Sequence, residues 1–203
     1  LTFSITGGSA ITATLDGSDV SFSAPANYNG SEDFTVSVSD GEYSDSQSIT
    51  VIVNAVNDAP VANAASGETA EDQSVVVTLS GSDIDGDNLS FSLDDDATNG
   101  SVTLDGSLAT YTPDANYNGD DSFSFSVSDG SESSSASVSL SISAVNDAPV
   151  LATVSDTNFD EDGSGSTSLS ASDVDGDDLT FSITGGSAIT ATLDGSDVSF
   201  SAP

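Results

Sequence analysis

The sequence predicts an all-β protein built from tandem β-sandwich modules of seven short strands each. Three observations lead to this prediction. Apolar and polar residues alternate through most of the chain, which is the period of a half-buried strand. The chain also repeats itself with a period of about 88 to 90 residues. No stretch shows apolar residues at the spacing of a helix.

The repeats divide the chain into one complete and two partial modules. Leu1–Pro25 returns letter for letter as Leu179–Pro203, and A-V-N-D-A-P-V occurs at both 55–61 and 144–150. Proline has no N–H for a central strand and favours extended backbone before it, so each of these heptads marks a short joint. We expect the C-terminal part of a first module at 1–58, a complete middle module at 59–147, and the N-terminal part of a third module at 148–203.

Strands of the middle module are placed by its alternating apolar residues. Asp105-Gly106 and Asn118-Gly119 are turn pairs between them. Seven strands in about 90 residues is the number expected of an immunoglobulin-like sandwich. The first and third modules hold too few strands to close a sandwich, so each should depend on neighbouring sequence or on another copy packed head to tail. The predicted strands lie at 60–65, 75–80, 89–93, 101–104, 108–112, 123–127 and 136–143.

The composition is strongly acidic. Among 203 residues there are 34 Asp and Glu but no Lys, Arg, His or Cys, which gives a net charge of −34. Such a charge with 35% apolar residues is typical of disorder, so the alternation is what argues for a folded chain. No basic residue can meet a phosphate, which excludes nucleic acid and direct membrane contact. Without His, Lys or Cys an enzyme lacks its usual bases and nucleophiles, and we expect none.

Acidic loops should gather at the joints. Successive loops of an antiparallel sandwich alternate between its two ends, so the bottom of one module and the top of the next face the same joint. For the first joint we expect Asn57, Asp58, Asp83, Asp85, Asp87 and Asp129, with Glu32 or Asp33 from the first module. For the second joint we expect Glu71, Asp72, Asp120, Asp121, Asn146, Asp147, Asp173, Asp175 and Asp177.

Carboxylates crowded in this way predict Ca²⁺ as a cofactor. Calcium takes six to eight oxygen ligands in irregular geometry, whereas Mg²⁺ tolerates irregularity poorly, and zinc and copper lack their preferred ligands here. The alternative for each D-x-D-G-D loop is a solvated turn. Two such loops beside two N-D-A-P joints favour calcium. We interpret Asn27-Tyr28-Asn29-Gly30 and its copy 116–119 as a core or corner tyrosine followed by a turn.

These residues resemble cadherin repeats, and more closely the bacterial Ig-like, cadherin-like tandem repeats in the extender region of giant RTX-type bacterial adhesins. The matching acids are Glu71, Asp83 with Asp85, and Asp129, and also Glu161, Asp173 with Asp175, and Asp40. The Asp-Arg-Glu motif of cadherins has no counterpart, because the chain has no Arg. The resemblance implies rods, stiffened by calcium bound at their joints, that hold a binding tip away from a cell surface.

We therefore expect a structural extender segment of a large secreted adhesin on the surface of a bacterium. Its expected partners are the neighbouring repeats of its own chain, with head-to-tail contact to other copies as a further option. The alternative function is a homophilic or matrix-binding adhesion module. Self-adhesion needs an exposed apolar anchor, and surfaces this acidic repel each other.

Overall fold

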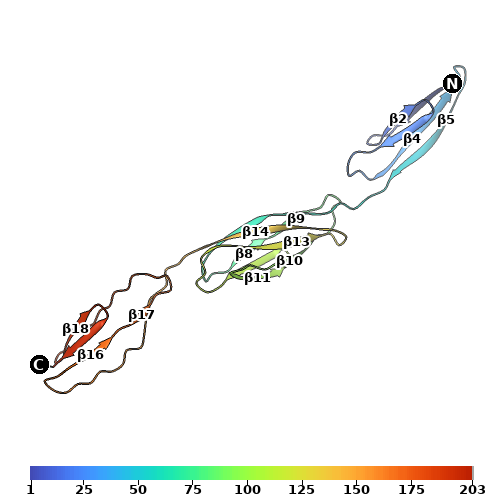
Figure 1. The fold of residues 1–203 in the computed structure, drawn as a ribbon. Helices are drawn as coiled ribbons and strands as arrows, with labels where there is room; N and C mark the ends of the chain where they lie inside the picture. The colour runs from blue at the N-terminus through green and yellow to red at the C-terminus, as the bar shows by residue number, and fades with distance from the viewer. Residues whose placement is uncertain (203) are drawn as a thin grey trace.

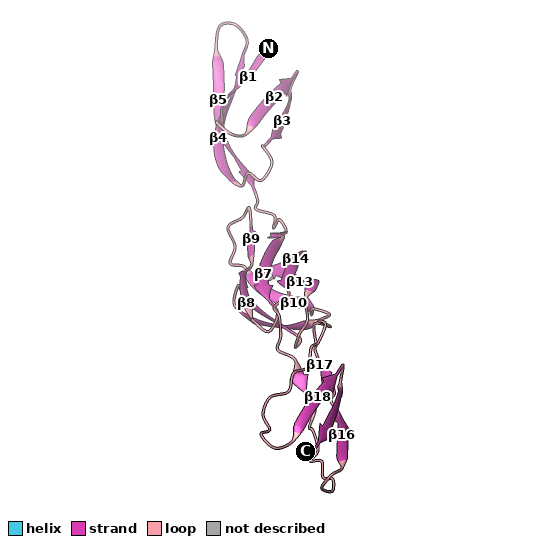
Figure 2. Cartoon of the chain, turned by 90° about the vertical axis from the view of Figure 1, so that its left-hand side faces the viewer, coloured by secondary structure: helices cyan, strands magenta, loops and turns pink. Residues whose placement is uncertain are grey.

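The computed structural model describes residues 1–202, and all its regular elements are β-strands. The three modules follow one another in chain order as separate, elongated bodies joined by thin connections (Figures 1 and 2). The prediction of tandem all-β sandwich modules is confirmed. No helix that could span a membrane occurs among the described residues.

The middle module contains all seven predicted strands. The first is broken into 61–63 and 65–70 and the second into 75–78 and 80–82, because each changes its pairing partner partway along. One sheet has the order β10-β13-β14-β7, with β7 parallel to β14, and the other has the order β11-β12-β8, with β6 and β9 pairing alongside. The strands are β6 (Val61–Asn63), β7 (Ala65–Ala70), β8 (Val75–Thr78), β9 (Ser80–Ser82), β10 (Ser90–Asp95), β11 (Gly100–Asp105), β12 (Leu108–Pro113), β13 (Gly119–Ser128) and β14 (Ser133–Ser143).

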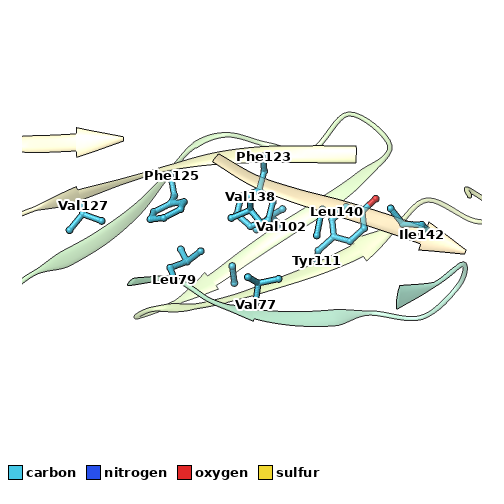
Figure 3. Packing of buried hydrophobic residues seen from close by; sticks show 11 residues of the cluster. Val77, Leu79, Val102, Tyr111, Phe123, Phe125, Val127, Val138, Leu140 and Ile142 are labelled. Carbon is cyan, nitrogen blue, oxygen red and sulfur yellow. The ribbon is translucent and has the colours of Figure 1, made fainter. Parts of the chain in front are cut away.

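The core of the middle module lies between these sheets (Figure 3). Phe123, Phe125 and Val127 are buried along β13, while the serines between them lie on the other face, as the two-residue period of a strand requires. Tyr111 of β12 is fully buried against them from the opposite sheet. This apolar interior fixes which loops lie at each end of the module.

Strand β13 begins at Gly119, four residues before the predicted start at 123. The additional residues pair with the end of β14, where Gly119 lies opposite Ile142. The hydroxyl of Tyr117 donates to the backbone oxygen of Asp120 at 2.7 Å. Tyr117 also packs partly buried against the core, in agreement with its interpretation as a core or corner residue, and it closes the loop before β13.

The outer modules are incomplete sandwiches. The first has β1 (Thr2–Gly7), β2 (Thr12–Asp16), β3 (Asp19–Ser23), β4 (Gly30–Ser39) and β5 (Ser44–Val53), in the orders β1-β4-β5 and β2-β3. The third has β15 (Val150–Leu151), β16 (Ser164–Ser168), β17 (Ala171–Ser172), β18 (Thr190–Asp194) and β19 (Asp197–Ser201), in the orders β15-β17 and β16-β19-β18. The first module thus lacks the two opening strands of a sandwich, and the described residues of the third lack the two closing ones.

Candidate metal centre at the two joints

Each joint is attached to the next module by the same contact. The N–H of Asp58 donates to Oδ2 of Asp85 at 2.7 Å, and the N–H of Asp147 donates to Oδ2 of Asp175 at 2.6 Å. The asparagine before each joint acid supports this geometry. The side-chain amide of Asn57 donates to the Asp58 carbonyl at 3.3 Å, and that of Asn146 to the Asp147 carbonyl at 2.8 Å. The two joints are therefore built alike.

The D-x-D-G-D loop of the middle module is folded around its first aspartate. Oδ1 of Asp83 accepts the N–H groups of Asp85 at 2.8 Å, Gly86 at 3.0 Å and Asp87 at 3.3 Å. Gly86 has φ of 81°, a left-handed conformation that favours glycine. Oδ2 of Asp83 is shielded from solvent and has no hydrogen-bond partner. A buried carboxylate oxygen without a partner is costly, and this chain has no cationic side chain to offset it.

The loop between β13 and β14 adds a further carboxylate to the first joint. Oδ2 of Asp129 accepts the side-chain amide of Asn57 at 2.9 Å, and Oδ1 accepts the N–H groups of Ser131 and Glu132. Hydrogen bonds from Glu132, Asn57 and Ser131 lower the pKa of Asp129. The structure thus brings residues of the joint together with both predicted loops of the middle module.

The second joint gathers acids from two modules around Asp147. Desolvation raises the pKa of Asp147, and the negative charges of neighbouring acids raise it further. Its Oδ2 is shielded from solvent and has no partner, like that of Asp83. The neighbouring acids come from the end of the middle module and from the start of the third, as the alternation of loops between the ends of each module predicts. They are Asp175, Asp72, Glu71 and Asp173.

Glu71 is the buried charged residue of this joint. Only 3% of it is exposed, and its carboxylate accepts the N–H of Val145 and, at 3.4 Å, the side-chain amide of Asn118. Asp72 has a left-handed φ of 59°, and its Oδ1 accepts the N–H of Asn116 at 3.1 Å. These bonds attach the turn between β7 and β8 to the loop before β13 and to the chain leaving the module.

Two predicted residues of the second joint lie elsewhere. The carboxylate of Asp121 accepts N–H groups of Thr98 and Asn99 and the hydroxyl of Tyr111, so it fixes a loop inside the middle module. Partial burial alone would raise the pKa of Asp121, but hydrogen bonds from Asn99 and its neighbours hold it below its usual value. Asp120 lies with Glu68 in a groove on the outer face of the sheet. We expected both acids to face the second joint, but Asp121 binds groups inside its own module and Asp120 lies on the sheet.

The two acids expected from the first module, Glu32 and Asp33, also bind groups of their own module. Glu32 accepts the N–H groups of Ser9, Ala10 and Ile11, and Asp33 accepts the hydroxyl of Thr50 at 2.6 Å. The alternation of loops between the two ends of a sandwich identifies the end of the module at which an acid lies. It does not show whether unpaired backbone N–H groups of the same module bind the carboxylate first, as they do here.

Asparagines of the two N-Y-N-G segments also line the joints, although the sequence interpretation assigned these segments only a core or corner tyrosine and a turn. Asn27 and Asn29 border a cavity of about 250 Å³ that also contacts Asp58 and Asp85. Asn116 borders a cavity of about 420 Å³ with Asp147 and Asp173. Repetition of N-Y-N-G beside both joints was the sequence feature that could have indicated this role.

All the side chains gathered at the joints offer oxygen as their metal ligand. Carboxylates and amide carbonyls are the donors that Ca²⁺ takes, so the residues present fit that ion. Within residues 1–202, no three acidic side chains are close enough together to form a finished metal cage. The joints are therefore acid-rich contacts with unpartnered oxygens rather than preformed ion sites.

The strands and joints define a class of tandem Ig-like, cadherin-like β-sandwich modules. Residues 57–141, which comprise most of the middle module, match the bacterial Ig domain family. No curated protein matches the chain.

Solved structures of similar fold include cadherin domains. Extracellular cadherin domains 1–4 of protocadherin gamma B7 are 14% identical, with 100% of this chain and 58% of that chain covered and a TM-score of 0.53. Domains EC1–3 of mouse protocadherin-24 are 14% identical, with coverage of 100% and 77% and a TM-score of 0.50. At this identity the likeness shows the fold alone.

A catalytic protein is also among the similar structures. The endo-fucoidan hydrolase MfFcnA4 of glycoside hydrolase family 107 is 18% identical over 98% of this chain, with a TM-score of 0.38. The present chain spans about a third (34%) of that enzyme's chain. A TM-score this low supports no inference about activity.

Proposed function

We propose that this chain is a calcium-stiffened extender segment of a large secreted bacterial surface adhesin. The observation that supports this most is the contact repeated at both joints, Asp58 with Asp85 and Asp147 with Asp175. A shielded carboxylate oxygen without a partner lies beside each contact. In a chain with no positive side chain, a hard dication is the group that can complete such a site.

The proposed ligands come from both sides of each joint. The first joint would use Asn57, Asp58, Asp83, Asp85, Asp87 and Asp129, with side-chain oxygens of Asn27 and Asn29. The second joint would use Glu71, Asp72, Asn146, Asp147, Asp173, Asp175 and Asp177, with that of Asn116. Asp120 and Asp121 are not part of this set, because their carboxylates lie elsewhere.

Bound calcium would supply the positive charge that the joints lack. Two carboxylates about 4 Å apart repel by about 1 kcal/mol even in water, and by more near protein. An ion between two modules offsets this repulsion and links loops of both, which restricts bending at the joint. Binding only the folded joint also adds stability in proportion to ln(1 + [Ca²⁺]/Kd).

A stiff row of modules suits a spacer. The longest strand, β14, has 11 residues and therefore extends about 36 Å along the module. Extracellular calcium modules bind at about 10⁻⁴ to 10⁻³ M, far above cytosolic levels. The chain would thus stay loosely folded in the cytosol, which suits export, and stiffen outside the cell.

Small-angle scattering and thermal unfolding with calcium or with chelator test this proposal. We expect a larger maximum dimension and a higher Tm in calcium at about 1 mM. Magnesium at the same concentration is the matched control for charge screening. An unchanged maximum dimension together with an unchanged Tm would reject the calcium proposal.

A further inference from the structure

Three Asn-Gly pairs occur in the sequence, and the structure places two of them at the joints. Asn29-Gly30 leads into β4, and Asn118-Gly119 leads into β13. Asn29 borders the cavity of about 250 Å³ that contacts Asp58 and Asp85. The side chain of Asn118 contacts an acid of the second joint, so both pairs lie beside the acids that we propose as calcium ligands.

The amide of Asn118 is directed at the buried acid of the second joint. Its Nδ2 donates to Oε2 of Glu71 at 3.4 Å, and only 3% of Glu71 is exposed. The carboxylate of Glu71 also accepts the N–H of Val145, in the chain that leaves the middle module. A change in the charge of Asn118 would therefore act directly on a buried carboxylate at this joint.

The backbone requires glycine after each of these two asparagines. Gly30 and Gly119 have φ of 143° and 130°, a conformation that residues with a side chain rarely adopt. A Cβ added to Gly30 would lie 3.2 Å from the hydroxyl oxygen of Tyr28, and one added to Gly119 would lie 3.3 Å from that of Tyr117. The Asn-Gly pair is consequently built into the corner before each of these strands.

Solvent reaches the two joint pairs more freely than the third pair. Both residues are exposed in the pairs 29–30 and 118–119, and both asparagines lie outside the strands. The third pair, Asn99-Gly100, is half-buried. The N–H of Asn99 donates to Asp121, and its carbonyl accepts the N–H of Asp114 at 2.8 Å. The backbone of the third pair is therefore held on both sides.

We propose that Asn29 and Asn118 are sites of spontaneous deamidation, and that the carboxylate formed at each joint strengthens its calcium site. This inference rests on the proposed function. The backbone nitrogen of the following glycine attacks Cγ of the asparagine, and the Cγ–Nδ2 bond breaks. The side-chain nitrogen leaves as ammonia and takes the proton of the glycine N–H. Glycine has no Cβ beside its nitrogen that would block this approach.

Solvent water completes the reaction. It opens the cyclic imide at Cγ, which gives aspartate, or at the main-chain carbonyl carbon, which gives isoaspartate. In either product one neutral amide has become one carboxylate, and no electrons have been gained or lost. Water is the only co-reactant, and the exposure of both joint pairs gives it access.

The new carboxylate has opposite effects with and without calcium. Beside Glu71 it replaces a hydrogen-bond donor by a second negative charge, which destabilises the joint in chelator. With calcium bound, it adds an anionic oxygen next to a dication, and ligand charge is one of the properties that set calcium affinity. We expect the calcium Kd of the second joint to fall about tenfold.

Peptide mass spectrometry of the full chain after storage at neutral pH tests the reaction. Pepsin serves for the digestion, because trypsin has no Lys or Arg to cut after. The same chain unfolded in urea is the reference in which all three pairs are free to react. We expect the mass change of deamidation at positions 29 and 118 well before position 99 in the folded chain. An equal rate at all three positions, or reaction in urea alone, would overturn the proposal.

Calcium titration tests the consequence for the second joint. The Asp85→Ala chain is the background, because its first joint is weakened. Adding Asn118→Asp should make calcium binding about tenfold tighter and should lower the Tm in chelator. Asn63→Asp is the matched control, since it adds the same charge on β6, where the Asn63 amide donates to Ser80. Equal gains in affinity from both substitutions would assign the effect to net charge and overturn the proposal.

A chain that keeps its amides separates ageing from other changes on storage. In Asn29→Gln/Asn118→Gln the side chains are one methylene longer and cannot form the same ring. Storage should increase the calcium affinity of the unsubstituted chain but not that of the glutamine chain. A fresh chain that binds no calcium would reject the proposed function. Calcium binding that deamidation at positions 29 and 118 does not strengthen would reject this inference alone.

Discussion

The two identical segments, compared over residues 1–24 and 179–202, adopt partly different structures. Thr2–Gly7 is strand β1, paired along its whole length with β4, whereas residues 180–185 form no strand. The hairpin that follows is the same in both copies, with β2–β3 and β18–β19 in equivalent registers. The two strands of a hairpin pair across a tight turn, whereas β1 pairs with a strand from a more distant part of the chain. Local sequence therefore specifies the hairpin, and only pairing specifies β1.

Burial in the two segments follows their neighbours in the same way. Ile11 is 4% exposed under Phe34, and its counterpart Ile189 is 45% exposed. Val198 is 1% exposed because β16 pairs with β19, while Val20 of the first module has no such neighbour and is only half-buried. Equal side chains thus contribute unequally to stability, and three experiments can test this difference.

Phe34→Ala should have the largest effect. Removing a buried phenylalanine ring costs about 3 to 5 kcal/mol, and Phe34 is the side chain that covers the segment 1–25. We expect amide exchange to lose protection in β1 and β4 but to remain unchanged in residues 179–202, observed on the isolated monomer at low concentration. Equal loss of protection in the two segments would show that their difference does not depend on Phe34.

The joints allow a similar comparison by calcium titration. Asp85→Ala should weaken the first joint on the order of tenfold or more, since even outer-shell changes cost about 10 to 100-fold in metal affinity. Asp175→Ala should weaken the second joint to a similar degree, because Oδ2 of Asp175 makes the same contact with Asp147 that Asp85 makes with Asp58. Asp94→Ala is the control, because its carboxylate accepts the Ser126 hydroxyl on the sheet. Isothermal calorimetry that found equal losses from Asp94 and Asp85 would contradict the ligand assignment.

Phe22→Ala and Phe200→Ala form a matched pair of intermediate effect. Phe22 packs on the Phe34 ring, so its loss should destabilise the first module by about 2 to 4 kcal/mol, the range of buried apolar truncations. Phe200 borders an open cavity and should cost about 1 kcal/mol or less, since little contact is lost. Urea unfolding followed by hydrogen exchange measures each module separately. The opposite ranking would indicate that the third module is closed in solution.

Lowering the pH should have the smallest and most local effect. Hydrogen bonds from the Ser9 hydroxyl and from the N–H groups of Ala10, Ile11 and Ser9 lower the pKa of Glu32 from 4.5 to about 2. A lowered folded-state pKa stabilises the folded loop above pH 4.5, and this contribution is lost as the pH falls toward 2. Amide protection of residues 9–11 should decline over that range, while residues 187–189 should show no such decline. Glu32→Gln should remove the pH dependence of residues 9–11, and its persistence would assign the effect to another acid.

Much of this architecture could be predicted from the sequence. Alternating apolar residues placed all seven strands of the middle module, because a two-residue period on one buried face leaves little freedom of register. The N-D-A-P joints and the D-x-D-G-D loops could also be located, since proline and glycine restrict the backbone locally. Contacts such as Asp58 with Asp85 then follow from the alternation of loops between the two ends of a sandwich.

Other features depended on contacts between residues far apart in the chain. Asp121 and Glu32 are acids that the sequence places at the joints. In the structure, N–H groups of their own modules donate to their carboxylates instead. Asn116 lines the second joint, although the sequence indicates only a core or corner tyrosine and a turn in its segment 116–119. Residues 2–7 and 180–185 carry one sequence, yet only the first stretch forms a strand, because a strand exists only where another strand takes up its backbone hydrogen bonds.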